Sequence, residues 1–286
     1  MRRPVDRPAG LPRSAHDLWD TGLPDSDVRQ GDLWVLTWDR AVVGHAMIAA
    51  ALDGFVLAWP VSLPGEPSFA PGLQVDTTPL GVPLTIWPTR ETGLGHHLLD
   101  RSQGQLLAPD RIRQVAQALD AGSDPGLPRA AGAPNSSEDR DMIDHWADLC
   151  FHDGRFADAL YLDSEKVKAA GAGSRVTSEL LGLPIAGFAD VWTGKSAVTA
   201  TQVGVLADHL RTDPENLVSG DPLGHIVERL ALPRFKREIR QRLSEVDTDE
   251  ATLREAVRSD FALAARDDSD DLTDRKIHDA IRRVGR

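Results

Sequence analysis

Residues 174–218 read SRVTSELLGLPIAGFADVWTGKSAVTATQVGVLADHLRTDPENLV, and this stretch carries the strongest structural signal in the second half of the chain. Apolar residues recur in it at helical spacing, and Gly182 separates the first two amphipathic segments. Two short helices that meet at a steep angle need a small residue between them, and Pro184 is well suited to open the second helix. Thr199 is expected to cap a third helix. The stretch therefore predicts a compact helical unit.

The same 45 residues resemble the phage-repressor (Xre-type) helix-turn-helix family. The matching pieces are the first motif helix, the LGLP turn, the second helix that ends in WTGK, and the trailing LADHLRTDPENL. The resemblance implies that the second motif helix lies in the major groove of double-stranded DNA. The candidate DNA-binding residues on and just after this helix are Gly187, Thr193 and Lys195.

The charge balance of this unit keeps an alternative open. Residues 174–220 contain three basic and five acidic residues, and Asp190 on the second motif helix would repel phosphate. Helices that read base edges carry Arg, Lys, Asn or Gln, and here Lys195 is the single cation. The alternative is a helical bundle that has this fold without binding DNA.

A basic segment follows the helix-turn-helix stretch. Between residues 229 and 242 six basic residues stand against one acidic residue. Phe235, Ile239 and Leu243 mark an apolar stripe at helical spacing, so the cations between them are expected to face outward and contact phosphate. The alternative is a solvated face that pairs with acidic neighbours at 245–250. The candidate phosphate contacts are Arg234, Lys236, Arg237 and Arg240.

The N-terminal half has the alternating pattern of β-strands. Residues 33–38 place Trp34, Leu36 and Trp38 on one face, and Asp53-Gly54 predicts a tight hairpin turn. The GDLWVLTW opening, the FVLAWPVSL strand and the closing LLDRSQGQLLAPDRIRQVAQAL are similar to the SH3-like barrel of the MazF/PemK family. The resemblance covers residues 31–119 and implies a small closed β-barrel.

In that family the barrel is a dimeric, metal-independent endoribonuclease that uses an Arg and a Ser or Thr. The resemblance places these roles on Arg40 and Ser62, which would stabilise charge on phosphorus and move protons. The long basic loop between the first two strands of the family is missing here, because Trp38-Asp39 runs almost directly into Arg40. This departure favours a non-catalytic barrel for dimerisation, sensing or binding of a protein partner.

Together these patterns predict an α+β protein with an SH3-like barrel followed by an all-α domain. The expected parts are an irregular arm (1–30), the barrel (31–119), a Gly/Pro/Ala-rich linker (120–136), the all-α domain (137–266, with the helix-turn-helix at 174–218), and an acidic break with a C-terminal helix (267–286).

Composition narrows the function classes. The net charge of −12 argues against indiscriminate coating of nucleic acid, and the one cysteine, Cys150, excludes an intramolecular disulfide and is expected in the core. No signal peptide and no membrane-spanning run are expected. The expected location is the cytoplasm. No metal or cofactor is expected, because neither of the two polar clusters has the spacing of a metal site. These clusters are His96, His97 and Asp100, and His145, Cys150, His152 and Asp153.

The favoured hypothesis is a bacterial transcriptional regulator, of toxin–antitoxin or phage type, that binds double-stranded DNA as a homodimer. The alternative hypothesis is a MazF-like endoribonuclease with a fused regulatory helical domain.

Overall fold

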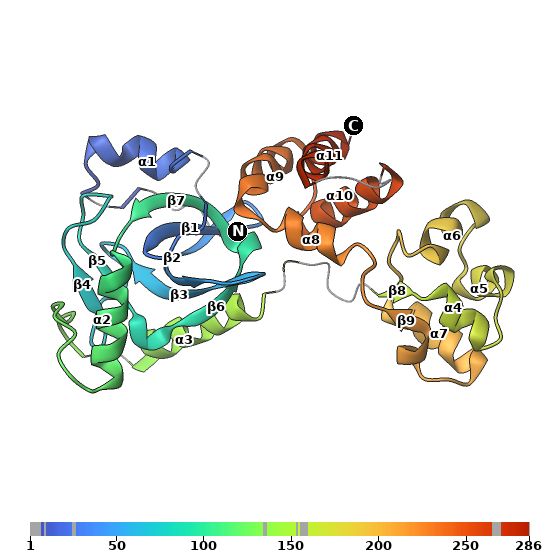
Figure 1. Cartoon of the computed structure of the whole chain (residues 1–286), viewed down its shortest axis with the longest axis horizontal. Coiled ribbons are helices and arrows are strands. Elements are labelled where there is room, and N and C mark those ends of the chain that lie inside the picture. The colour runs from blue at the N-terminus through green and yellow to red at the C-terminus, as the bar shows by residue number, and fades with distance from the viewer. Residues whose placement is uncertain are drawn as a thin grey trace. The chain divides into compact units, whose positions relative to one another are not determined.

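The computed structural model describes residues 7–8, 10–24, 27–133, 136–152, 154, 160–264 and 270–285. The chain forms two compact units that alternate along the sequence (Figure 1). The sheet unit comprises Met1–Gly154 and Ala231–Ser244, and the helical unit comprises Arg155–Leu230 and Glu245–Arg286. The structure is mixed α/β, with 47% helix and 20% strand.

The sheet unit is built on one antiparallel sheet of seven strands. The strands are β1 (Asp32–Trp38), β2 (Ala41–Ala51), β3 (Phe55–Ser62), β4 (Leu73–Val75), β5 (Leu84–Ile86), β6 (Thr92–Gly95) and β7 (Leu99–Gln105). The helices are α1 (His16–Thr21), α2 (Pro109–Asp120), α3 (Ser136–Cys150) and α9 (Pro233–Glu245), with short 3-10 turns η1 (Arg13–Ala15), η2 (Pro88–Arg90) and η3 (His96–Leu98).

The prediction of a closed barrel is wrong. The strands run in the order β4-β5-β3-β2-β1-β7, with β6 also paired to β3, and the sheet does not close. The outer edge of β4 is occupied by another segment: Gln74 donates its backbone N–H to Pro128 O at 2.7 Å, and Ala130 donates to Gly72 O at 2.8 Å. Residues 128–130, expected to be linker, therefore cover the edge that a barrel would need to pair with β7.

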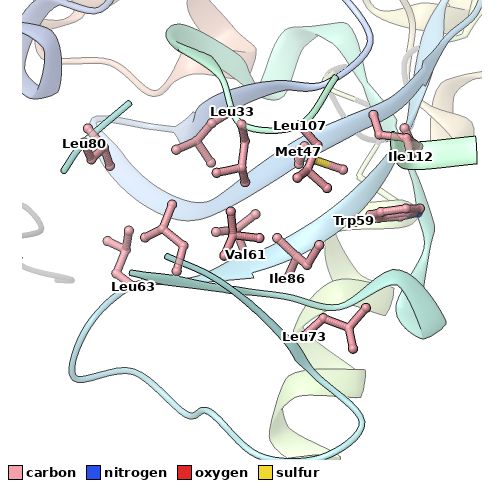
Figure 2. Packing of buried hydrophobic residues seen from close by; sticks show 14 of the residues in the cluster. Leu33, Met47, Trp59, Val61, Leu63, Leu73, Leu80, Ile86, Leu107 and Ile112 are labelled. Atoms are coloured by element: carbon pink, nitrogen blue, oxygen red, sulfur yellow. The ribbon is translucent and has the colours of Figure 1, made fainter. Parts of the chain in front are cut away.

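The strand alternation expected from the sequence is present in two apolar clusters, one on each face of β1. Leu33 packs with Met47 and Val61 in one cluster, and Figure 2 shows these side chains facing one another from neighbouring strands. Trp34 and Leu36 belong to the other cluster. Trp19 of α1 and Ile112 and Val115 of α2 complete the first cluster, while Trp146 and Leu149 of α3 complete the second.

The helical unit has its own core. It contains β8 (Tyr161–Leu162), α4 (Ser164–Ala169), α5 (Ser174–Leu181), α6 (Ile185–Trp192), α7 (Ala200–Leu210), η4 (Pro214–Leu217), β9 (Val218–Ser219), α8 (Gly224–Leu230), α10 (Glu250–Ala264) and α11 (Asp270–Arg283). The two short strands pair with each other. Val203, Leu206 and Leu217 are completely buried at the centre of this unit.

Several expected boundaries differ from the structure. The N-terminal arm contains α1, whose Trp19 is buried and stacks on His45 with ring centroids 5.4 Å apart. Two helices assigned to the all-α domain, α3 and α9, belong to the sheet unit instead. The last helix begins at Asp270, where an acidic break was expected. Within the described residues, no helix combines the length and apolarity needed to cross a membrane.

Candidate functional site

The turn between α5 and α6 has the backbone conformation that its sequence predicts. Gly182 adopts a left-handed conformation with φ of 64° and donates its N–H to Glu179 O, and Leu183 donates to Ser178 O. A residue with a Cβ is strained at this φ, which explains the glycine. Pro184 then occupies the N-cap of α6 in an extended conformation. The two helices are thus joined by a short turn fixed by hydrogen bonds.

Helix α7 lies behind this pair and supports it. Thr199 and Gln202 form a capping box, in which Gln202 N donates to Thr199 Oγ1 and Thr199 N donates to Gln202 Oε1. Phe188 and Val191 of α6 are buried in the same cluster as Leu206 of α7. Apolar packing therefore fixes the inner face of α6 and leaves its outer face exposed.

The end of α6 is held by a buried arginine from α10. The Arg258 guanidinium donates to Gly194 O at 3.1 Å and to Lys195 O at 2.7 Å, and it forms an ion pair with Asp221. Its cationic centre lies 4.1 Å from the Tyr161 ring centroid. Burial and the nearby Glu255 raise the pKa of Tyr161, and burial raises the pKa of Glu255. Every donor of Arg258 is directed into this network, so its role here is to position the backbone that follows α6.

The outer face of α6 carries small residues and one carboxylate, the half-buried Asp190. Gly187 and Thr193 are exposed, and a Cβ added at Gly187 would meet no atom within 4 Å. The Thr193 hydroxyl donates to Ala189 O at 2.9 Å, so its proton is used within the helix. Lys195 is half-buried and follows the helix. The candidate residues lie on one segment as expected, but they offer few groups that could read bases.

A further cation of this motif is Arg175, the second residue of α5. Its side chain is 91% exposed and forms an ion pair with Glu179 across one helical turn. Over the whole helical unit the sequence contains 22 acidic and 15 basic residues. The unit as a whole is therefore acidic and has no broad positive field.

No family model, no curated protein and no solved structure matches this chain.

The prediction that Lys236 faces outward is wrong. Lys236 is only 1% exposed, and its Nζ donates to Thr37 O at 2.9 Å and to His97 O at 2.8 Å within the sheet unit. The ammonium also lies 5.3 Å from the Trp38 ring centroid. The expected stripe of Phe235, Ile239 and Leu243 is indeed buried, but the buried face of α9 is wider than that stripe. Lys236 is therefore a structural residue and not a phosphate contact.

The remaining cations of α9 divide into two groups. Arg240 is 37% exposed and forms an ion pair with the buried carboxylate of Asp100, which competes with phosphate for this cation. Arg242 is buried. Arg234 and Arg237 are exposed. Because α9 belongs to the sheet unit, these two cannot be counted as part of the helix-turn-helix surface.

The two residues expected to be catalytic each have a structural role. Asp39 and Arg40 both have positive φ and form the tight turn between β1 and β2, which is why no long loop exists here. The Arg40 guanidinium donates twice to Leu243 O, at 2.9 and 2.6 Å. Ser62 is buried and accepts a hydrogen bond from the Trp87 indole at 3.0 Å. The open sheet and these contacts give no support to a ribonuclease site.

The sequence reasoning missed a histidine pair that joins the two rejected clusters. His97 Nε2 lies 2.9 Å from His152 Nδ1, although the residues are 55 positions apart. Trp38 packs edge-on against both rings. Asp153 of the second cluster lies outside the described residues, and Cys150 is exposed rather than in the core. Burial lowers the pKa of His96, which points away from a cationic role for it at neutral pH.

Proposed function

We propose that the helical unit is the DNA-binding module of a homodimeric regulator, with α6 lying in the major groove. The observation that carries the proposal is the turn at Gly182, which joins α5 to α6 while α7 packs behind them. In helix-turn-helix proteins the second helix enters the groove and the first crosses the backbone. The open space at Gly187 supports a close approach of α6 to the bases.

The scarcity of cations sets the expected strength of this binding. Arg175 on α5 and Lys195 after α6 are the residues proposed to contact phosphate. Each neutralised phosphate contributes about 0.9 to the slope of log affinity against log salt, so a dimer with two contacts per protomer has a slope of about −4. Sequence preference must then come largely from the shape of the DNA and from apolar contacts.

The test is selection of the full chain on a randomised duplex library, followed by titration of the selected duplex by fluorescence anisotropy. Gly187→Glu should weaken binding at least tenfold relative to Gly187→Gln, because the two side chains have the same length and only one repels phosphate. Lys195→Gln should reduce the salt slope by about 1 per protomer.

The control is Arg113→Gln on α2 of the sheet unit, where the side chain is 60% exposed and paired with Asp110. This variant loses the same charge and should bind like the wild type. The proposal fails if no duplex is enriched at low salt, or if the two Gly187 variants bind equally well.

A further inference from the structure

Helix α3 is fixed to the sheet unit by one of its faces. Trp146 and Leu149 are buried in the cluster beside β6, with α3 next to that strand in Figure 1. His145 lies 2.7 Å from Val43 O through its Nε2, and Asp139 forms an ion pair with Arg90. This inner face alone accounts for the packing of the helix.

The opposite face of α3 is also apolar, which its packing does not explain. Ile143 is 51% exposed, and Phe151, directly after the helix, is 86% exposed. Ala147 and Cys150 are exposed between them. The four residues stand at spacing i, i+4, i+7 and i+8, so they form one stripe along about 12 Å of helix. We call this stripe the outer face of α3.

An acidic edge runs along the outer face. Asp141, Asp144 and Asp148 are all exposed. At about 100° per residue they begin about 20° beyond Phe151 and follow the stripe for its length. The apolar stripe is therefore bordered on that side by three carboxylates.

This charge pattern decides between the occupants that such a face could have. A second copy of α3 would bring like charges together, and an anionic lipid surface would be repelled by the same carboxylates. A basic amphipathic helix would bury its apolar residues on the stripe and set its cations against the acidic edge. We propose that the outer face of α3 is a docking surface for a basic amphipathic helix of a partner protein.

The probe is a pair of fluorescent helical peptides with the same apolar stripe, one flanked by Lys and Arg and the other by Glu. Anisotropy titration of the full chain should show at least tenfold tighter binding of the basic peptide. The double variant Ile143→Ser/Phe151→Ser should lose at least tenfold of that affinity. Asp144→Asn/Asp148→Asn should reduce the preference for the basic peptide by a similar factor.

The matched control is Leu52→Ser, because Leu52 is an apolar residue of similar exposure (43%) after β2. It should leave peptide binding unchanged, which separates docking on α3 from general attraction of a basic peptide to an acidic protein. Because all these positions are exposed, thermal unfolding of the variants should match the wild type.

Three results would overturn the proposal. The first is equal binding of the two peptides, and the second is equal loss of binding in the Leu52 variant. The third is that Ile143 and Phe151 are needed for another kind of binding in place of peptide binding. Sedimentation would show this as loss of self-association in the double variant, and vesicle flotation would show it as loss of binding to phosphatidylglycerol.

Discussion

The ammonium group of Lys236 lies in the interior of the sheet unit, where a charge is costly to bury. Two backbone carbonyls, Thr37 O and His97 O, accept hydrogen bonds from it, and the Trp38 ring faces it. Buried charges are tolerated in proteins when hydrogen bonds of this kind replace the lost water. The residue thereby joins α9 to β1 and to η3.

Lys236→Met should lower the free energy of unfolding by about 2–4 kcal/mol, because it leaves two buried carbonyls without this donor. Arg237→Met is the control, since Arg237 is the next residue on the same helix and is exposed. Its effect should stay within about 0.5 kcal/mol. Urea denaturation of both variants measures the difference, and similar losses would contradict the role given to Lys236.

His45 makes the stability of the sheet unit depend on pH. Burial, with a contribution from Arg101, lowers the pKa of His45 to about 3, and its Nε2 has no hydrogen-bond partner. Its unfolded pKa is about 6.5, so between these values the unfolded chain binds the extra proton. Stability therefore falls as the pH drops below about 6.5, by about 2 kcal/mol between pH 7 and pH 5.

His45→Phe should remove this part of the pH dependence while keeping the stacking on Trp19. Denaturant titrations at pH 7 and pH 5 compare the wild type with the variant. His209→Phe, at an exposed position on α7, should leave the wild-type pH dependence in place. An unchanged pH dependence in the His45 variant would show that His45 does not stay neutral in the folded state.

At the level of elements, α6 depends on α10 for its position. Arg258→Gln leaves the buried Asp221 carboxylate without its partner and frees two carbonyls at the end of α6. The expected loss is about 3–5 kcal/mol in the stability of the helical unit. Arg283→Gln, which breaks the more exposed pair with Asp260, should cost at most about 1 kcal/mol. Chemical denaturation followed by circular dichroism measures the stability of both variants. Equal losses of stability would show that Arg258 does not hold the end of α6.

Local patterns predicted elements well where a single short-range signal determines the structure. The Gly182 turn, the Thr199 cap and the Asp53-Gly54 turn all depend on neighbouring residues, and all three are present. The outward placement of Lys236 failed because the apolar stripe spans about 80° and Lys236 lies only about 20° beyond it. The sheet unit buries a wider arc of α9 than the stripe alone indicates.

Long-range pairing was not predictable from these patterns. The barrel expectation failed because residues 128–130 pair with the edge of β4, and the Gly/Pro/Ala-rich segment 120–136 that contains them gives no strand signal. The His97–His152 pair joins residues from two separate clusters that alternation and spacing cannot bring together. Of the candidate DNA-binding residues, those near α6 could be placed from the sequence. The burial of Lys236 and the ion pair of Arg240 could not be predicted from it.

At the level of the whole molecule, two units with separate cores should give two unfolding transitions. Six of the seven tryptophans belong to the sheet unit, and Trp192 belongs to the helical unit. Tryptophan fluorescence should therefore follow mainly the sheet unit, whereas circular dichroism follows both. Lys236→Met should shift the fluorescence midpoint, and Arg258→Gln should shift the dichroism curve with little change in fluorescence. Coincident curves in both variants would instead indicate one cooperative unit.

The alternation of the two units along the chain has a consequence for the order of folding during synthesis. The carbonyls of Thr37 and His97 leave the ribosome 199 and 139 residues before Lys236, which binds both of them. The nascent sheet unit therefore lacks α9 while residues 160–230 emerge and begin to form their own core. Contacts this distant in sequence slow folding, and a polypeptide released after Gly154 would lack the helix that completes the sheet.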